Sequence, residues 1–181
     1  WFHFSAEQGD ARAQVKLGFR YAKGDGVPQD DKEAIKWFRL AAEQGDAEAQ
    51  FMLGTGYHEA RGVPQDDKEA VKWFLVAAER GYARAQRSLG YRYLRGEGVP
   101  QNYKEAVKWF RLAAEQGDAS GQFMLGLAYN NGRGVPQDYK EAVKWYRLAA
   151  EQGDASGQAK LGFMYYHGTG VPQDYASAHM L

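Results

Sequence analysis

Histidines and carboxylates are the side chains of this sequence that could bind a metal or transfer protons. The four histidines are His3, His58, His167 and His179. No two of them have the i, i+4 spacing with which a helix presents a pair of zinc ligands, and the His58-Glu59 pair lacks the second histidine of a metalloprotease motif. We therefore expect the histidines to pack or to be solvated, and we predict no metal site.

Nucleophile and phosphate-binding motifs are the next candidates for chemistry. Gly24-Asp25-Gly26 is a weak match to a phosphate loop, but Pro28 follows it and no Gly-Lys-Ser/Thr sequence occurs. No Ser precedes a Lys by three residues, and no Gly-x-Ser-x-Gly elbow is present. Cysteine is absent, which excludes disulfides and thiolate ligands. The sequence predicts a protein that is not an enzyme and has no cofactor.

One basic and aromatic cluster could bind a partner: Arg84, Arg87, Tyr91, Arg92 and Arg95. Such a cluster can contact nucleic-acid phosphates or a protein. Glu48 and Glu59 precede it, and the whole chain is neutral, with 23 Lys plus Arg against 23 Asp plus Glu. This balance argues against a nucleic-acid partner and favours a protein or peptide. No stretch of 18 apolar residues occurs, so no membrane partner is expected.

An internal repeat must position these residues. Tryptophan recurs every 36 residues, at Trp1, Trp37, Trp73, Trp109 and Trp145. The five prolines have the same spacing, as do the Leu-Gly pairs that begin at Leu17, Leu53, Leu89, Leu125 and Leu161. Several residue types in one register over five periods establish a repeat protein.

Each repeat predicts two helices. The first, the A helix, covers 11–23 in repeat 1, with Asp10 placed to cap it. The loop that ends at Pro28 follows, and the second, the B helix, starts with Asp30 and Glu33 in a capping box. Helices of this length are unstable alone in water, so the pairs must stack into an array. We expect one array over 1–181, with repeats 1 to 5 at about 10–45, 46–81, 82–117, 118–153 and 154–181, and with 1–9 as the end of a preceding B helix.

Gly18 and its equivalents lie in the middle of every A helix, where glycine costs about 1 kcal/mol relative to alanine. A cost that recurs in every repeat indicates close helix–helix approach against a bulky neighbour. Trp37 and Phe38 of the B helix are the candidate neighbours. We expect the Trp positions, the Tyr21 positions and the Gly18 positions to belong to the core.

The repeat motif resembles the Sel1-like repeat family, a relative of the 34-residue tetratricopeptide repeats. Repeat 4 carries the motif as Ala119, Gln122, Leu125, Gly126, Tyr129, Gly132, Gly134, Val135, Pro136, Gln137, Asp138, Glu141, Ala142, Lys144, Trp145, Tyr146, Ala149 and Ala150. The resemblance covers the whole chain. It implies an all-α, right-handed α/α superhelix (solenoid) with the A helices on the concave side, and it implies an adaptor role.

Three positions in repeats 2 and 3 depart from the motif. Ala60 replaces the first loop glycine, Arg80 replaces a glutamine, and Tyr82 replaces the aspartate that caps an A helix. Because a lost aspartate cap costs about 1 kcal/mol, we expect the third A helix to fray more readily at its start.

Positions that vary among the repeats are free of the shared scaffold, and on the A helices they share one side. Exposed Arg, Met and aromatic residues are typical of protein-binding patches, whereas drift on a solvated face is the alternative explanation. The predicted site on the concave face comprises Arg84, Arg87, Tyr91, Arg92, Arg95, Phe51, His58, Phe123 and Leu127.

The function predicted from these observations is a non-enzymatic scaffold or adaptor that binds a peptide or partner protein on the A-helix face. The alternative is an architectural protein. Both ends of the sequence cut through a B helix, so open ends could stack head to tail into an assembly, or the chain is a fragment.

Overall fold

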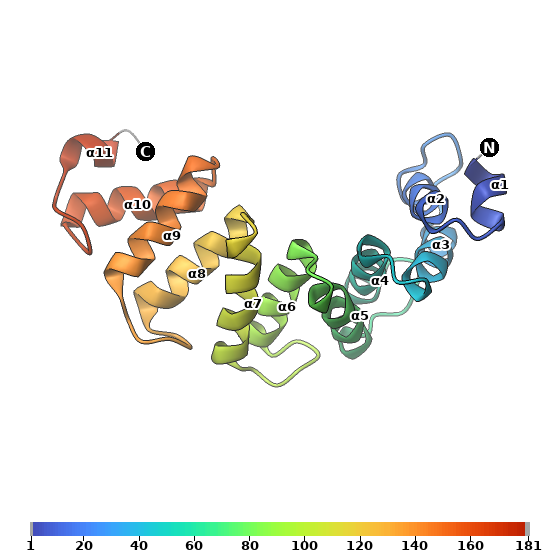
Figure 1. Cartoon of the computed structure of the whole chain (residues 1–181), viewed down its shortest axis with the longest axis horizontal. Coiled ribbons are helices and arrows are strands. Elements are labelled where there is room, and N and C mark those ends of the chain that lie inside the picture. The colour runs from blue at the N-terminus through green and yellow to red at the C-terminus, as the bar shows by residue number, and fades with distance from the viewer. Residues whose placement is uncertain (1, 180–181) are drawn as a thin grey trace. The chain divides into compact units, whose positions relative to one another are not determined.

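Helices joined by short loops make up the computed structural model, which describes residues 2–179 (Figure 1). The helices are α1 (Phe2–Glu7), α2 (Ala11–Lys23), α3 (Asp31–Glu43), α4 (Ala47–Glu59), α5 (Asp67–Glu79), α6 (Ala83–Arg95), α7 (Tyr103–Glu115), α8 (Ala119–Asn131), α9 (Tyr139–Glu151), α10 (Ala155–His167) and α11 (Tyr175–His179). No strand occurs among the described residues. The prediction of an all-α fold with alternating A helices (even numbers from α2 to α10) and B helices is confirmed.

Contacts divide the chain into two compact units. The first unit contains the chain up to Ala85 together with Gly96–Pro100, and the second contains Gln86–Arg95 and the chain from Gln101 onward. Within the first unit each of the helices α1 to α5 packs on the next one in the sequence, and α7 to α11 do the same in the second. Within each unit, successive helices therefore bury their apolar faces against one another.

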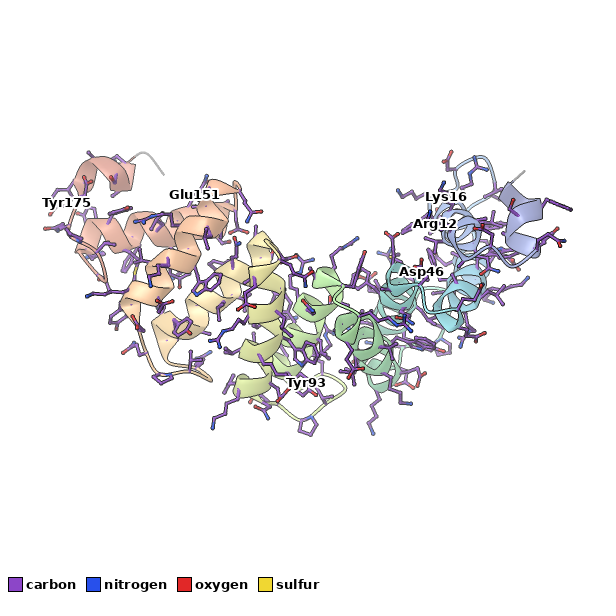
Figure 2. All side chains as sticks on the ribbon, in the orientation of Figure 1. Arg12, Lys16, Asp46, Tyr93, Glu151 and Tyr175 are labelled. Carbon is purple, nitrogen blue, oxygen red and sulfur yellow. The ribbon has the colours of Figure 1, made fainter. Side chains whose placement is uncertain are left out.

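Aspartates begin four of the A helices, as predicted. Their carboxylates accept a hydrogen bond from the N–H three residues later at 2.7–2.8 Å, at Asp10, Asp46, Asp118 and Asp154 (Asp46 is labelled in Figure 2). At the start of α6, where Tyr82 stands, the N–H of Ala85 instead donates to the backbone carbonyl of Tyr82 at 3.0 Å. The helix still starts at the equivalent residue, and its easier fraying stays a prediction.

The capping box predicted for the B helices forms only in part. The Asp30 carboxylate accepts from the N–H groups of Lys32 and Glu33 at 2.9 and 3.1 Å, as expected of an N-cap. The reciprocal bond is replaced, because the N–H of Asp30 already donates to the carbonyl of Tyr21 at 3.0 Å. The Glu33 side chain accepts from Lys36 at 3.3 Å. The N-terminus of each B helix is thus tied to the A helix before it.

Ala60 occupies a backbone conformation that favours glycine. Its φ and ψ are 56° and 33°, and it is the C-cap of α4. Glycines hold the equivalent position after α2, α8 and α10, with φ of 64–72°. A left-handed conformation costs a residue with a Cβ about 1–2 kcal/mol, so the departure from the motif noted in the sequence is a strained turn in the structure.

The glycine in the middle of the A helix lies against an aromatic ring of the B helix. A Cβ added to Gly18 would lie 2.6 Å from the ring of Phe38. The same geometry recurs where glycines 54, 90 and 126 meet rings 74, 110 and 146. Close approach is confirmed, and Phe38 is the partner of Gly18. Trp37, the other candidate, packs instead in a cluster with Ala6, Ala13 and Leu17.

Buried glutamines connect successive repeats. Gln14 donates to the carbonyl of Ala6 at 3.0 Å, and its own side-chain oxygen accepts from Gln44 at 2.8 Å. Equivalent pairs join Gln116 to Gln86 and Gln152 to Gln122, each at 2.7 Å. A buried amide needs such partners, because an unpaired polar group in the interior costs about 1–3 kcal/mol.

Arg80 interrupts this chain of glutamines. It replaces the glutamine that would donate to Gln50, and the buried Gln50 side-chain oxygen has no hydrogen-bond partner among the described residues. The guanidinium of Arg80 lies instead next to Gly45. The departure at Arg80 therefore leaves one buried acceptor unsatisfied.

We predict that Arg80→Gln raises the free energy of unfolding by about 1 kcal/mol, because the new amide can donate to Gln50. Urea denaturation followed by circular dichroism measures the change. The reverse exchange in repeat 1, Gln44→Arg, is the matched control and should lower stability by a similar amount. Equal stability of both variants and the wild type would contradict this account of the glutamine chain.

Tyr146 carries the second unsatisfied group of interest. Its side chain is completely buried, and its hydroxyl has no partner among the described residues. Burial raises the pKa of this tyrosine to about 12. Because the folded state holds the proton more tightly than the unfolded state, whose tyrosine pKa is about 10, the stability linked to this group is present below pH ~10 and falls as the pH rises toward the folded pKa.

We predict that Tyr146→Phe stabilises the protein by about 1 kcal/mol at pH 7, since phenylalanine occupies the equivalent sites 38, 74 and 110 and leaves no unpaired hydroxyl. The advantage of the variant should grow above pH 10. Denaturation midpoints at pH 7 and pH 10.5 measure both effects. A variant that is less stable at both pH values would show that the hydroxyl has a favourable contact.

Candidate partner-binding surface

Helix α6 carries most of the predicted site. Its scaffold residues Ala85, Gln86, Leu89 and Gly90 are buried. Arg84 and Arg95 are exposed, and Arg87 and Tyr91 are partly exposed. Helical geometry places residues at i, i+3/i+4 and i+7/i+8 on one face. The side chains of Arg87, Tyr91 and Arg95 thus form a continuous stripe on the part of α6 that belongs to the second unit.

The polar groups of this stripe have defined neighbours. Arg87 forms an ion pair with Asp118 at 3.6 Å, and the guanidinium of Arg95 lies 5.5 Å from the centre of the Tyr91 ring. Tyr91 packs edge-on against Phe110 at 5.2 Å. Burial raises the pKa of the Tyr91 hydroxyl, while Arg87 and Arg95 act in the opposite direction. The stripe is a cationic surface with a half-buried aromatic centre.

The A helices α2, α4, α6 and α8 each supply one ring to the aromatic residue of their own B helix. In α2 and α6 the ring stands at the repeat position of residue 19, and in α4 and α8 it stands at the repeat position of residue 15. The four pairs, at centroid distances of 5.1–5.9 Å, are Phe19 with Phe38, Phe51 with Phe74, Tyr91 with Phe110 and Phe123 with Tyr146. Part of the variation among repeats therefore serves the core, because one ring is needed but two positions can provide it.

Phe51 illustrates this structural role. Only 6% of its surface is exposed, and its ring contacts those of Phe74 at 5.7 Å and Tyr82 at 5.4 Å. The guanidinium of Arg84 covers it at 4.7 Å from the ring centre. These four residues all belong to the first unit. Phe51 offers a partner little surface, and Arg84 holds the ring in place.

Arg92 and His58, like Phe51, interact within the fold. Arg92 is 7% exposed. The equivalent residues Gly56, Ala128 and Met164 are buried too, whereas Arg20 in repeat 1 is exposed, so this helical position faces the interior in repeats 2 to 5. His58 lies 2.6 Å from the carboxylate of Asp67 in the first unit, with 31% of each side chain exposed. Sequence variation alone could not separate these residues from the surface stripe.

Phe123 and Leu127 of α8 lie near the α6 stripe in the second unit. Both are partly exposed and pack, together with Tyr91, on a buried cluster of Ala106, Phe110 and Met124. The structure thus brings together five predicted residues in this unit: Arg87, Tyr91, Arg95, Phe123 and Leu127.

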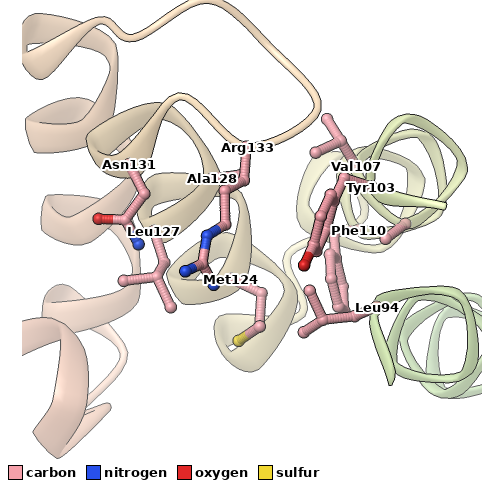
Figure 3. Close-up of a pocket in the computed structure, with 10 residues that line it drawn as sticks. Leu94, Tyr103, Val107, Phe110, Met124, Leu127, Ala128, Asn131 and Arg133 are labelled. Carbon is pink, nitrogen blue, oxygen red and sulfur yellow. The ribbon is translucent and has the colours of Figure 1, made fainter. Parts of the chain in front are cut away.

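A crevice of about 60 Å³ opens beside Leu127, between α6, α7 and α8 (Figure 3). Its apolar wall comprises Leu94, Ala106, Val107, Phe110, Met124, Leu127 and Ala128, and the polar groups Tyr103, Asn131 and Arg133 lie at its mouth. The predicted site lacked the residues of the mouth, because they come from helix ends and a loop. Comparison of repeats at these positions could have identified them.

Within residues 2–179, no three His, Asp or Glu side chains are grouped so that they could hold a metal ion. Over the same range, no helix has both the length and the apolar character needed to span a bilayer.

Five repeats of paired helices, fixed glycine–aromatic contacts and a variable A-helix surface define the class as α-helical repeat proteins. The Sel1 repeat model matches residues 11–46, 47–82, 83–118, 119–154 and 155–181, so this chain belongs to the Sel1 repeat family. Proteins of the family are generally scaffolds for protein interaction and are typically non-catalytic. No curated protein matches the chain.

Solved structures of Sel1 repeat proteins are similar to this chain over almost its whole length. The protective antigen c5321 from uropathogenic Escherichia coli, which displays the same repeat fold, is 44% identical over 99% of this chain, with a TM-score of 0.97. A Sel1 repeat protein from Oxalobacter formigenes is 41% identical over 96% of it, with a TM-score of 0.90. The chain spans 38% of the Escherichia coli protein and 69% of the Oxalobacter protein. The immunity protein Pa5087 from Pseudomonas aeruginosa, 22% identical with a TM-score of 0.59, covers 99% of this chain and shares the fold; this chain covers 64% of that protein.

Proposed function

We propose that this chain is a non-enzymatic adaptor that binds a peptide segment of a partner protein on its A-helix face. The site lies in the second unit, on the stripe of Arg87, Tyr91 and Arg95 and on the adjoining Phe123 and Leu127. The observation that carries the proposal is that the structure gathers these cationic, aromatic and apolar side chains on one partly exposed surface.

The composition of this surface supports protein recognition. Arginine and aromatic residues are enriched where proteins bind each other, and they supply most of the binding energy at such sites. Tyr91 is held by Phe110 and covered by Arg95, so its ring is already ordered before a partner arrives. A partner then loses less entropy on binding than it would on a flexible surface.

The outer face of the B helices has a different character. Lysine–glutamate pairs at i, i+3 recur there in repeats 1 to 4: Lys36 with Glu33, Lys72 with Glu69, Lys108 with Glu105, and Lys144 with Glu141. Exposed pairs of this kind add solubility and little stability. A face with the same ion pair in each of these repeats offers no distinctive surface, which favours the variable A-helix face as the binding site.

We predict that peptides selected from a random display library on the intact chain lose about tenfold in affinity for a variant carrying Arg87→Ala and Arg95→Ala. Fluorescence polarisation measures the dissociation constants. The matched control carries Lys108→Ala and Lys144→Ala, which remove two positive charges from the B helices of the same unit. The control should bind as the wild type does.

Equal losses of peptide affinity in both variants, or no loss in either, would contradict a binding site on the A helices. A library that yields no binding peptide would count against it as well. Static light scattering of the same samples tests the alternative of end-to-end self-association, which predicts a mass that grows with protein concentration.

A further inference from the structure

We infer that the crevice between α6, α7 and α8 binds an acidic peptide segment, with one apolar side chain in the crevice and an adjacent Asp or Glu side chain at Arg133. The inference rests on the proposed function, since it specifies the chemistry of the peptide. It comes from comparing this crevice with its counterpart in the first unit.

The crevice has a counterpart in the first unit, at the equivalent positions of the repeat. In the first unit it is lined by Ala22, Asp31, Ala34, Ile35, Phe38, Met52, Thr55, Gly56 and Arg61, and its volume is about 30 Å³. In the second unit Leu94, Tyr103, Leu127 and Ala128 replace Ala22, Asp31, Thr55 and Gly56, and the volume is about 60 Å³. The second crevice is larger and has more apolar walls.

This volume suits the tip of an apolar side chain. It exceeds the ~10–15 Å³ that a cavity needs to hold one water. The walls offer carbon atoms from Phe110, Met124 and Leu127, whose contacts would favour burial of a leucine or methionine tip over hydration. Water in the crevice gains few hydrogen bonds from such walls, so little free energy is lost when an apolar side chain displaces that water.

The charge at the mouth differs more strongly between the two crevices. In the first unit Arg61 forms an ion pair with Glu59 at 2.8 Å, and Asp31 adds a second carboxylate to the lining. In the second unit the loop arginine is retained as Arg133, but Asn131 stands in the place of Glu59 and Tyr103 in the place of Asp31. Both of these carboxylates are therefore lost while the positive charge remains.

The loop that carries Arg133 is fixed against the mouth. A Cβ at Gly134 would collide with the carbonyl of Tyr103, so glycine permits the loop to lie directly on the start of α7. The Arg133 guanidinium lies 5.9 Å from the centre of the Tyr103 ring. Figure 3 shows Arg133 and Tyr103 facing each other across the opening. A carboxylate placed there meets a guanidinium that is already oriented, next to an apolar cavity.

Arg133 is the positive side chain that lines this crevice. The attraction of such exposed charges for a carboxylate is weakened by salt. An acidic residue next to a leucine in the partner satisfies both the cavity and the arginine, whereas a basic or a purely apolar segment satisfies at most the cavity.

The test uses a fluorescein-labelled peptide, acetylated and amidated at its ends, with Leu-Glu-Glu inside a Ser/Gly sequence. Fluorescence polarisation should show an affinity for the protein that falls about tenfold when the leucine becomes alanine. It should fall about fivefold when both glutamates become glutamine. Raised salt should weaken the binding of the Leu-Glu-Glu peptide and leave the binding of the glutamine peptide unchanged.

Variants of the protein then locate the site. Arg133→Gln and Asn131→Glu should each remove the preference for glutamate over glutamine, the first by deleting the charge and the second by restoring the carboxylate found beside Arg61. Both residues are exposed, so the fold should be kept. Arg61→Gln, the matched change in the first unit, should leave the preference intact.

Equal affinity for the glutamate and glutamine peptides would overturn the inference, as would an equal effect of Arg61→Gln and Arg133→Gln. The inference would also be overturned if a peptide without glutamates bound, and if this binding depended only on a free C-terminal carboxylate. The proposed function fails separately: it falls if library-selected peptides ignore Arg87 and Arg95, and it stands if they require these residues while the Leu-Glu-Glu peptide does not bind.

Discussion

The contact between a helical glycine and an aromatic ring sets the geometry of every complete repeat. With a Cβ missing at Gly18, the ring of Phe38 lies directly on the backbone of the A helix. The two helices then approach closely enough for a second ring, from the A helix itself, to pack edge-on against the first. The glycine loses about 1 kcal/mol of helix propensity, which the buried ring more than offsets, since an aromatic side chain buries about 150–250 Å². The same arrangement in four repeats explains why their other contacts also recur.

This constraint divides the surface into parts that can vary and parts that cannot. The B helix supplies the large ring and keeps the same lysine–glutamate pair on its outer face. The A helix needs one ring, at either of two positions, and is otherwise free on its outer side. Arg87 and Arg95 occupy such free positions in the second unit, and Arg133 lies in a loop whose glycine fits against the next helix. A scaffold that is uniform inside can therefore present different chemistry from one repeat to the next.

Much of the fold could be predicted from the period alone. The 36-residue spacing places the helices, the aspartate caps and the glycine–ring contact, because these depend on neighbours within one repeat. The site was harder to predict. Phe51 and Arg92 vary among repeats and yet are buried, since the first supplies the ring of its repeat and the second occupies an inward position. The crevice is formed by three helices together. Asn131 at its mouth is important because it stands where the first unit has the carboxylate of Glu59. No pattern within a single helix shows this.

The measurement that tests the central contact most directly is a double-mutant cycle on Gly18 and Phe38, followed by urea denaturation. The account predicts that Gly18→Ala destabilises the wild type by about 1–3 kcal/mol through overpacking, although alanine is the better helix former. In a Phe38→Leu background, where the ring is absent, the same change should cost little or become stabilising. If Gly18→Ala stabilised the wild type, or cost the same in both backgrounds, the glycine would not be required by the ring and the account would be wrong.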